Sequence, residues 1–586
     1  MAVLLRKIEK ILFITELILV ITLVIFLWYK ILLPQSYYMG IILIVTFTII
    51  SLNFNYSRKL LIIQIALVFL LLRNVYDISM NYSIIPFGDG NWDYGVVKTF
   101  LQKESVFVIN EPNILSLYSG WPLLHTFAAV LSSVSGLDAF HLALLLPSII
   151  SITSFMFVYL LVEIMRKALK LDTSITPIAL LIYTVSPDSI FWPMQFVRQN
   201  IGILLFTVIL YLIVKSVGNP SNPKYRALLF FFIFPLVIGH HFTSFIAVVY
   251  LFLFSAFSVI GKRFGKDLKT DLWHQTRMTL LNLMLVAFSA LFVWWNYVAT
   301  MVWPYIISGI ERLSRLIMGI REVEFLPRQA SYPTLLTPPW VSSLLLLRDI
   351  LIYLPVFFGL LIIAKKAPKA SEKFFLVYST LAFASVIILD NLIFKIGTIR
   401  IVAISLPILV LLSAVLYSYI QNKLKHIWKI SITATIVATL LFSSFIGLWG
   451  HNFAPLHLYD PNINSAEIGE RNKDFIRIAD FQARIPIKNF DIVWADDRSP
   501  LLLLLEPEDY SKIRWLPNKD VQKLGTYNHE IVYVFKDLNL YFYHAGIFSP
   551  VDTPENVEIV KRALEQRLEN KFNCIYSDGK YDVWST

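Results

Sequence analysis

The sequence is poor in cysteine and in charged residues. Cys574 is the only cysteine, so no disulfide can form within the chain. Charged residues make up 16% of the 586 residues, whereas soluble domains carry about 25%. Hydrophobic residues make up 57% of the chain. This balance excludes an ordinary soluble protein and predicts a chain whose main solvent is lipid.

Nucleotide-binding signatures are also absent from the sequence. No glycine-rich loop of the P-loop type occurs, so neither ATP nor a nucleotide sugar is expected as a direct partner. The net charge of +11 would suit a nucleic-acid partner. We exclude that partner because the basic residues lie in short loops between apolar runs, which is the positive-inside pattern of membrane proteins.

The apolar runs predict a polytopic α-helical membrane protein with about 13 transmembrane helices. A helix needs about 20 largely apolar residues to cross a bilayer. The predicted spans are Ile11–Leu33, Tyr38–Leu52, Leu60–Leu72, Ala139–Met165, Ser174–Phe191, Ile201–Val214, Ala227–Gly239, Thr243–Ile260, Met278–Val302, Ser342–Ala364, Phe374–Leu389, Ile401–Ile420 and Ile430–Trp449.

The loops between these runs alternate in charge. Every second loop is basic, from the segment before the first span to the loop after the twelfth. This alternation predicts a cytoplasmic N-terminus and an extracytoplasmic C-terminal domain in the cell membrane. We therefore expect four parts, which are N-terminal transmembrane helices (1–73), a first outer loop with juxtamembrane helices (74–137), a transmembrane core with a second large outer loop at 303–341 (138–450), and an extracytoplasmic α/β domain (451–586).

The C-terminal part has the patterns of a small α/β domain. Phe490–Ala495 and Ile531–Phe535 are predicted strands, and Ala466–Ala479 and Val557–Asn570 are predicted helices. Near the end of the chain, Asp-Gly at 578–579 separates two short apolar runs, which predicts a hairpin of strands at 574–576 and 581–584.

The first outer loop holds two acidic residues with helical spacing. Asp89 and Asp93 are four residues apart, which places both carboxylates on one face if the segment is helical. A carboxylate there can act as a general base or, with its partner, hold a divalent cation such as magnesium or manganese. The alternative is a solvated loop in which Asp89 caps a helix.

The passage after these residues carries a resemblance to a known family. Tyr118-Ser119-Gly120-Trp121-Pro122 forms a turn, an apolar surface helix is expected over Trp121–Gly136, and Leu137-Asp138-Ala139-Phe140 enters the next span. Together with Asp89 and Asp93, this order resembles the GT-C class of membrane glycosyltransferases, which includes protein mannosyltransferases, aminoarabinose transferases and archaeal relatives. Two extra spans at the start and the Gly-Trp-Pro turn depart from that pattern.

The resemblance implies an inverting glycosyltransferase. Its donor would be a sugar on a polyprenyl or dolichyl phosphate, and its acceptor a glycan, lipid or protein outside the membrane. Asp89 and Asp93 would be the catalytic carboxylates. Arg198, Arg400 and Lys395, at predicted outer ends of spans, would bind the donor phosphate. The alternative for each arginine is an anchor that reaches the lipid headgroups.

Five further residues are predicted to contact substrate: His125, His240, His241, Arg328 and Tyr332. For the histidine pair, a polar turn at the membrane surface is an equal alternative, and for the charges around Arg328 a solvated interfacial helix is the alternative. Two other functions remain open, which are transfer of a lipid-linked oligosaccharide to protein and, outside enzymes, membrane transport. A transporter would show polar residues at mid-membrane, whereas here they gather in outer loops.

Overall fold

The computed structural model describes the chain in segments. These are residues 34–53, 57–74, 88–106, 119–192, 195–219, 222–264, 270–303, 339–366, 371–390, 398–424, 426–446, 489–495, 513–515, 529–535, 566–577 and 581–585, with a few isolated residues between them. They form two compact units. Unit 1 contains Met1–Ile78, Pro147–Met194 and Arg198–Leu456, and unit 2 contains Ser79–Leu146, Gln195–Val197 and His457–Thr586.

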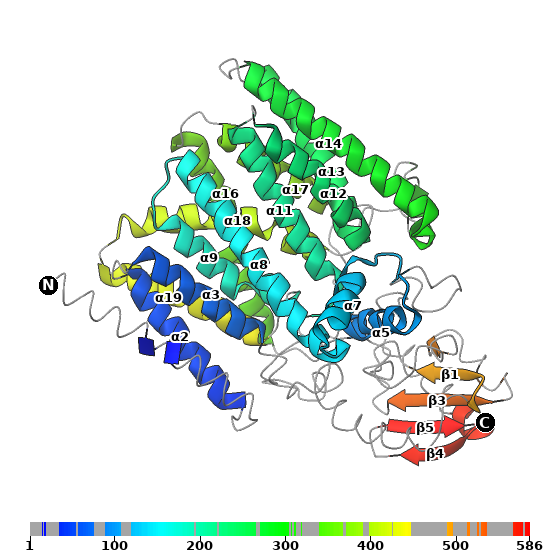
Figure 1. Cartoon of the computed structure of the whole chain (residues 1–586). Coiled ribbons are helices and arrows are strands. Elements are labelled where there is room, and N and C mark those ends of the chain that lie inside the picture. Colours follow the sequence, from blue (N-terminus) through cyan, green and yellow to red (C-terminus); the bar gives the residue numbers. More distant parts are fainter. Residues whose placement is uncertain are drawn as a thin grey trace. The chain divides into compact units, whose positions relative to one another are not determined.

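Unit 1 is built from long apolar helices (Figure 1). They are α2 (Pro34–Asn53), α3 (Arg58–Arg73), α8 (Ala139–Ala168), α9 (Ile175–Val185), α10 (Pro187–Phe191), α11 (Arg198–Gly218), α12 (Pro223–Gly239), α13 (His241–Phe264), α14 (Thr270–Tyr297), α16 (Pro339–Lys366), α17 (Ser371–Leu389), α18 (Thr398–Gln421) and α19 (His426–Ile446). The first residues of α8, up to Leu146, belong to unit 2.

The protein is a multi-pass membrane protein. In the described part of the chain, seven helices are long and apolar enough to cross a bilayer. Every predicted span from Tyr38 onward overlaps at least one helix. The first predicted span, Ile11–Leu33, lies almost entirely outside the described residues.

One predicted span is interrupted. The apolar run Ser174–Phe191 forms two helices, because α9 ends at Val185 and α10 begins at Pro187. Proline lacks a backbone N–H and disfavours helical geometry in the residue before it. Ser186 is accordingly extended, with ψ at 132°. The break places Asp188 in a separate short helix.

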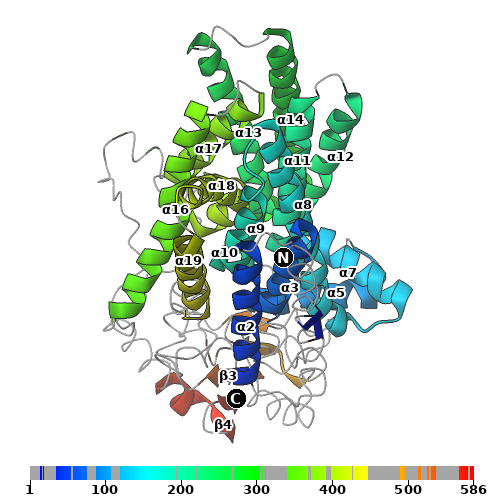
Figure 2. The same cartoon turned by 90° about the vertical axis from the view of Figure 1, so that its left-hand side faces the viewer.

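Helix α18 lies at the centre of unit 1. It packs against α9 and α16 and also contacts α10, α11 and α17. Within the apolar stretch of α18, 94% of the helix is buried inside the protein. In the corresponding stretch of α16, 28% is buried. On another side of the unit, α12, α13 and α14 pack on one another (Figure 2). A residue at the start of α18 is therefore carried by the protein core, not by a lipid-facing helix.

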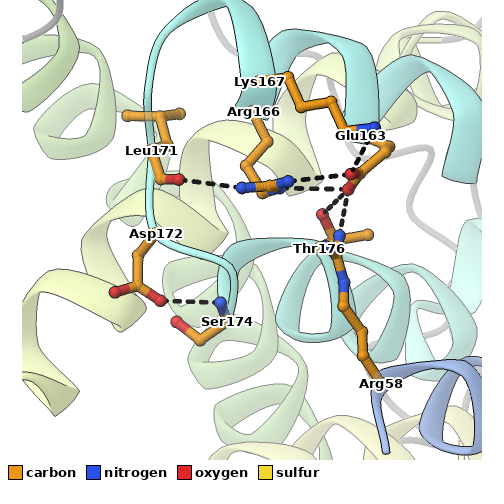
Figure 3. A network of polar contacts seen from close by, with 8 residues as sticks. All are labelled: Arg58, Glu163, Arg166, Lys167, Leu171, Asp172, Ser174 and Thr176. Carbon is orange, nitrogen blue, oxygen red and sulfur yellow. Dashed lines mark hydrogen bonds and ion pairs between the residues drawn. The ribbon is translucent and has the colours of Figure 1, made fainter.

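A buried carboxylate joins three helices of unit 1 (Figure 3). Glu163 of α8 accepts two hydrogen bonds from Arg166, at 2.9 and 3.1 Å, and one from the hydroxyl of Thr176 of α9 at 2.9 Å. Arg58 of α3 donates to the same carboxylate, and the Lys167 ammonium lies 3.4 Å away. We call these five residues the Glu163 network. It ties α3, α8 and α9 together at the end predicted to be cytoplasmic.

Unit 2 contains α5 (Gly88–Lys103), α7 (Leu123–Ser135) and a five-stranded sheet. Helix α5 begins at Gly88, so Asp89 and Asp93 share one helix as predicted. Helix α7 follows Pro122 and ends at Gly136, whose φ of 70° suits glycine. The surface helix predicted over Trp121–Gly136 thus corresponds to α7.

The sheet has the strand order β2-β1-β3-β5-β4. Its strands are β1 (Ile492–Ala495), β2 (Ile513–Trp515), β3 (Glu530–Phe535), β4 (Asn573–Ser577) and β5 (Tyr581–Ser585). The neighbours of β1 are parallel to it, whereas β5 is antiparallel to β3 and β4 (Figure 1). The predicted strands and hairpin are therefore present. The predicted helix Ala466–Ala479 lies outside the described residues, and residues 566–570 of the predicted helix Val557–Asn570 are helical.

Candidate functional site

Arg400 stands in the first turn of α18, where two aromatic rings hold its guanidinium group. The guanidinium carbon lies 5.6 Å from the ring centroid of Trp192 and 5.9 Å from that of Phe242. Aromatic faces attract cations. Arg400 is half-buried between these rings, at the start of a helix that other helices enclose.

His240 and His241 form the turn between α12 and α13. Their ring centroids are 4.8 Å apart. The Nδ1 atom of His240 accepts a hydrogen bond from the backbone N–H of Thr243 at 3.2 Å and lies 2.8 Å from the Thr243 hydroxyl. Because Nδ1 accepts, the ring proton of neutral His240 lies on Nε2, which is then a donor.

The first turn of α11 lies close to this histidine turn. A Cβ atom on Gly202 would lie 2.7 Å from the Thr243 hydroxyl oxygen and 3.1 Å from the Cβ atom of His240. Glycine at this position therefore allows α11 to approach the turn. Arg198 begins α11, four residues before Gly202, so its side chain lies on the same face of the helix.

Arg198 and Arg400 act electrostatically on the histidine turn. Burial lowers the pKa of His240 well below its ordinary value, and the nearby charges of His241, Arg198 and Arg400 lower it further. His240 is therefore neutral at physiological pH, and its Nε2–H can donate without carrying a charge. The structure thus brings together Arg198, His240, His241 and Arg400, four residues predicted from the sequence. We call them the arginine–histidine cluster.

The arginine–histidine cluster is suited to an anion. Arg198 begins α11, His241 begins α13, and Arg400 lies in the first turn of α18. Helix N-termini present backbone N–H groups and a partial positive charge. Two guanidinium groups add full positive charges with a fork of donors that matches phosphate. This arrangement can bind a phosphate group or stabilise negative charge that develops on one.

A second pair of predicted residues meets in unit 2. The Nε2 atom of His125 in α7 lies 2.7 Å from Oδ1 of Asp93 in α5, and their side chains are 0% and 1% exposed. The ring of Phe100 contacts the imidazole edge to face at 6.0 Å. The pair joins α5 to α7 and holds the Asp93 carboxylate in one orientation. In this geometry Asp93 is a buried partner of His125.

Comparisons with known proteins identify the fold. No protein-family model matches the chain, and no curated protein matches its sequence. Several solved structures are similar, and two of them are described here. ArnT from Cupriavidus metallidurans bound to undecaprenyl phosphate is 10% identical with a TM-score of 0.51, and the match covers 90% of this chain and 98% of ArnT. The archaeal oligosaccharyltransferase AglB from Archaeoglobus fulgidus, in complex with an inhibitory peptide and a dolichol-phosphate, is 10% identical with a TM-score of 0.52, over 85% of this chain and 72% of AglB.

The chain has the GT-C fold. This confirms the architecture that the order of Asp89, Asp93 and the turn before α7 indicated. At 10% sequence identity, the similarity concerns the fold and assigns no role to individual residues.

The remaining predicted site residues lie outside the described side chains. Asp89 belongs to the first turn of α5, but only its backbone is described. Lys395, Arg328 and Tyr332 lie outside the described residues. Their roles stay predictions.

Asp188 of α10 is a polar residue that sequence reasoning did not select. Its carboxylate lies 3.5 Å from the Tyr353 hydroxyl of α16. The signal in the sequence is Ser186-Pro187-Asp188, where a proline interrupts an apolar run and an acidic residue follows it directly.

The metal site predicted at Asp89 and Asp93 includes the side chain of Asp89, which lies outside the described side chains. These contain no group of three or more His, Cys, Asp or Glu residues placed to hold a metal ion. Oδ1 of Asp93 already contacts the imidazole of His125. Magnesium or manganese dependence stays a prediction.

Proposed function

We propose that this protein is an inverting glycosyltransferase that moves a sugar from a polyprenyl- or dolichyl-phosphate donor to a glycan, lipid or protein on the outer face of the membrane. The observation that carries the proposal is the arginine–histidine cluster, in which Arg198, His240, His241 and Arg400 meet at the starts of helices. The two proteins that share the fold were crystallised with undecaprenyl phosphate and dolichol-phosphate, which supports a lipid phosphate as the ligand.

In the proposed reaction, this chain supplies the base for the acceptor proton and the groups that stabilise the departing phosphate. An acceptor hydroxyl gives its proton to a carboxylate of the first outer loop, for which Asp89 is the candidate. The acceptor oxygen bonds to the anomeric carbon while the bond from that carbon to the phosphate oxygen breaks. The electron pair stays on the departing lipid phosphate, and attack from the opposite side inverts the anomeric centre.

The arginine–histidine cluster stabilises the charge on the departing phosphate. Arg198 and Arg400 supply positive charge, and Nε2–H of His240 supplies a neutral donor. Donors that are already in place when charge develops lower the barrier most effectively. The Asp93–His125 pair has a supporting role, because it fixes α5, the helix that carries Asp89.

The test is sugar transfer by the purified full-length protein from a panel of polyprenyl-phosphate sugars. Arg198→Ala and Arg400→Ala should weaken the binding of undecaprenyl phosphate, whereas Asp89→Asn should abolish transfer and leave that binding intact. If both arginine variants bind undecaprenyl phosphate as tightly as the native protein, the phosphate site is wrongly assigned. If Asp89→Asn retains full transfer, Asp89 is not the base.

Oligosaccharyl transfer is the second candidate, favoured by the match to AglB. The same assay separates the two reactions. A lipid-linked oligosaccharide used in preference to a lipid-linked monosaccharide, with transfer to an asparagine-containing peptide, would identify this second function.

A further inference from the structure

Gln199 lies in the first turn of α11, directly after Arg198, and is 3% exposed. Neither Nε2 nor Oε1 of its amide has a hydrogen-bond partner among the described residues. Burying an amide without partners costs free energy, and native proteins rarely leave such groups unsatisfied. An orphaned amide in a buried position therefore points to a group that binds there.

The position of Gln199 is set by its neighbour on the helix. Gly202 follows it by three residues, and residues three apart are adjacent on a helix surface. A Cβ atom on Gly202 would lie within 3.1 Å of both the Thr243 hydroxyl oxygen and the Cβ atom of His240. Gln199 thus lies next to Arg198 on α11 and near the face of the helix that meets the turn carrying His240.

The chemistry of the amide restricts the ligand. The Nε2 group donates hydrogen bonds and the Oε1 atom accepts them. A phosphodiester is ionised at neutral pH and offers acceptors only, so it can satisfy Nε2 but not Oε1. A sugar hydroxyl both donates and accepts. One hydroxyl, or two neighbouring hydroxyls of a sugar ring, satisfies both ends of the amide.

We infer that Gln199 binds hydroxyl groups of the sugar that the lipid phosphate carries, an inference that rests on the proposed function. The arginines and histidines hold the phosphate, which donor and product share. Gln199 contacts the part that only the donor has. The residue therefore distinguishes the sugar-bearing lipid from the bare lipid phosphate that transfer leaves behind.

The binding test compares two matched substitutions. Gln199→Met keeps the side-chain volume and removes both polar groups. Gln64→Met makes the same change at an equally buried glutamine of α3, also 3% exposed. The affinity of each variant is measured for undecaprenyl phosphate alone and for a panel of polyprenyl-phosphate sugars. Gln199→Met should lose about tenfold in affinity for the sugar-bearing lipid that the native protein prefers. Its affinity for undecaprenyl phosphate, and both affinities of Gln64→Met, should be unchanged.

Thermal unfolding without ligand gives a second readout, with opposite signs for the two variants. Gln199→Met replaces an unsatisfied amide with an apolar group, so the melting temperature should rise. Gln64 has polar interactions, so Gln64→Met should lower the melting temperature. Gln199→Asn keeps both polar groups on a shorter stem and should lose only part of the preference for sugar.

Three results would overturn the inference: equal weakening of both lipids by Gln199→Met, an unchanged preference for sugar in that variant, or a native protein that binds no sugar-bearing lipid better than undecaprenyl phosphate. Arg198→Ala and Arg400→Ala separate these failures from failure of the proposed function. If the arginine variants lose undecaprenyl phosphate while Gln199→Met keeps its sugar preference, only the role of Gln199 is wrong. If the arginine variants bind the lipid normally, the phosphate site itself is wrong.

Discussion

Unit 1 contains two charged clusters that are organised in opposite ways. In the Glu163 network, one buried carboxylate accepts hydrogen bonds from two arginines and a threonine, and a lysine lies nearby (Figure 3). The arginine–histidine cluster places two arginines beside two histidines, and the guanidinium group of Arg400 lies over two aromatic rings. The first cluster pairs its positive charges with a carboxylate, as a structural site does. The second concentrates positive potential, as a site for an anionic ligand does.

The largest effect is expected from removing an arginine of the arginine–histidine cluster. Arg400→Ala should lower sugar transfer by about 100-fold or more, because loss of one donor to a developing oxyanion has that consequence in other enzymes. Transfer is measured from the preferred lipid-linked sugar. Arg166→Ala, in the Glu163 network, is the matched control and should lower the melting temperature while the folded fraction keeps its activity. If Arg166→Ala lost activity in its folded fraction and Arg400→Ala kept it, the distinction between the two clusters would be wrong.

Neutralising the carboxylate of the Glu163 network should cost stability and not chemistry. Glu163→Gln leaves Arg58, Arg166 and Lys167 without their shared anion, and breaking a buried ion pair in this way costs about 3 kcal/mol. Thermal or denaturant unfolding in detergent measures the change. Glu104→Gln, at an exposed carboxylate, should change the stability by less than about 0.5 kcal/mol. An unchanged melting temperature in Glu163→Gln would show that the network is not structural.

The Asp93–His125 pair belongs to neither cluster. Two substitutions determine whether its role is structural or chemical. Asp93→Asn keeps an oxygen for the imidazole, whereas Asp93→Leu removes it and should destabilise the protein by about 1–3 kcal/mol. If the pair is structural, Asn should retain most of the transfer activity that Leu loses through unfolding. Loss of transfer in a stably folded Asp93→Asn variant would make Asp93 a chemical participant.

The smallest effect is expected from moving the histidine turn slightly. Gly202→Ala places a methyl group 2.7 Å from the Thr243 hydroxyl oxygen, so the turn must shift. We expect lipid-phosphate affinity to fall several-fold, with a stability cost of about 1 kcal/mol. Gly218→Ala, on the same helix, would meet only the end of the Glu372 side chain and should leave affinity unchanged. Equal effects of both glycine variants would remove the link between Gly202 and the site.

Local patterns were sufficient for most elements of this fold. Apolar runs of sufficient length predicted the helices, and Asp-Gly near the C-terminus predicted the pairing of β4 with β5. The interruption at Pro187 was missed because hydropathy alone does not register the missing backbone N–H of one proline. Strand β2, with three residues, is too short to give a periodic signal.

The sequence predicted which residues belong to the arginine–histidine cluster, but not that they lie together. Each residue of the arginine–histidine cluster stands out as a polar residue at the end of an apolar run. Nothing in their spacing indicates that Arg198, His240 and Arg400 act on one another, because they belong to three helices distant in sequence. For Gln199, its burial and its unsatisfied amide are properties that only packing creates.

The sequence by itself determined that the chain crosses a membrane many times, because span length and apolarity are local properties that the thickness of the bilayer selects. It also determined which polar residues lie at the ends of those spans. Only the tertiary structure decided that Asp93 is buried against His125, and that Arg198 and Arg400 converge on the His240–His241 turn. Contacts of this kind depend on which helix faces meet, and helix packing is decided by side-chain shape across the whole bundle.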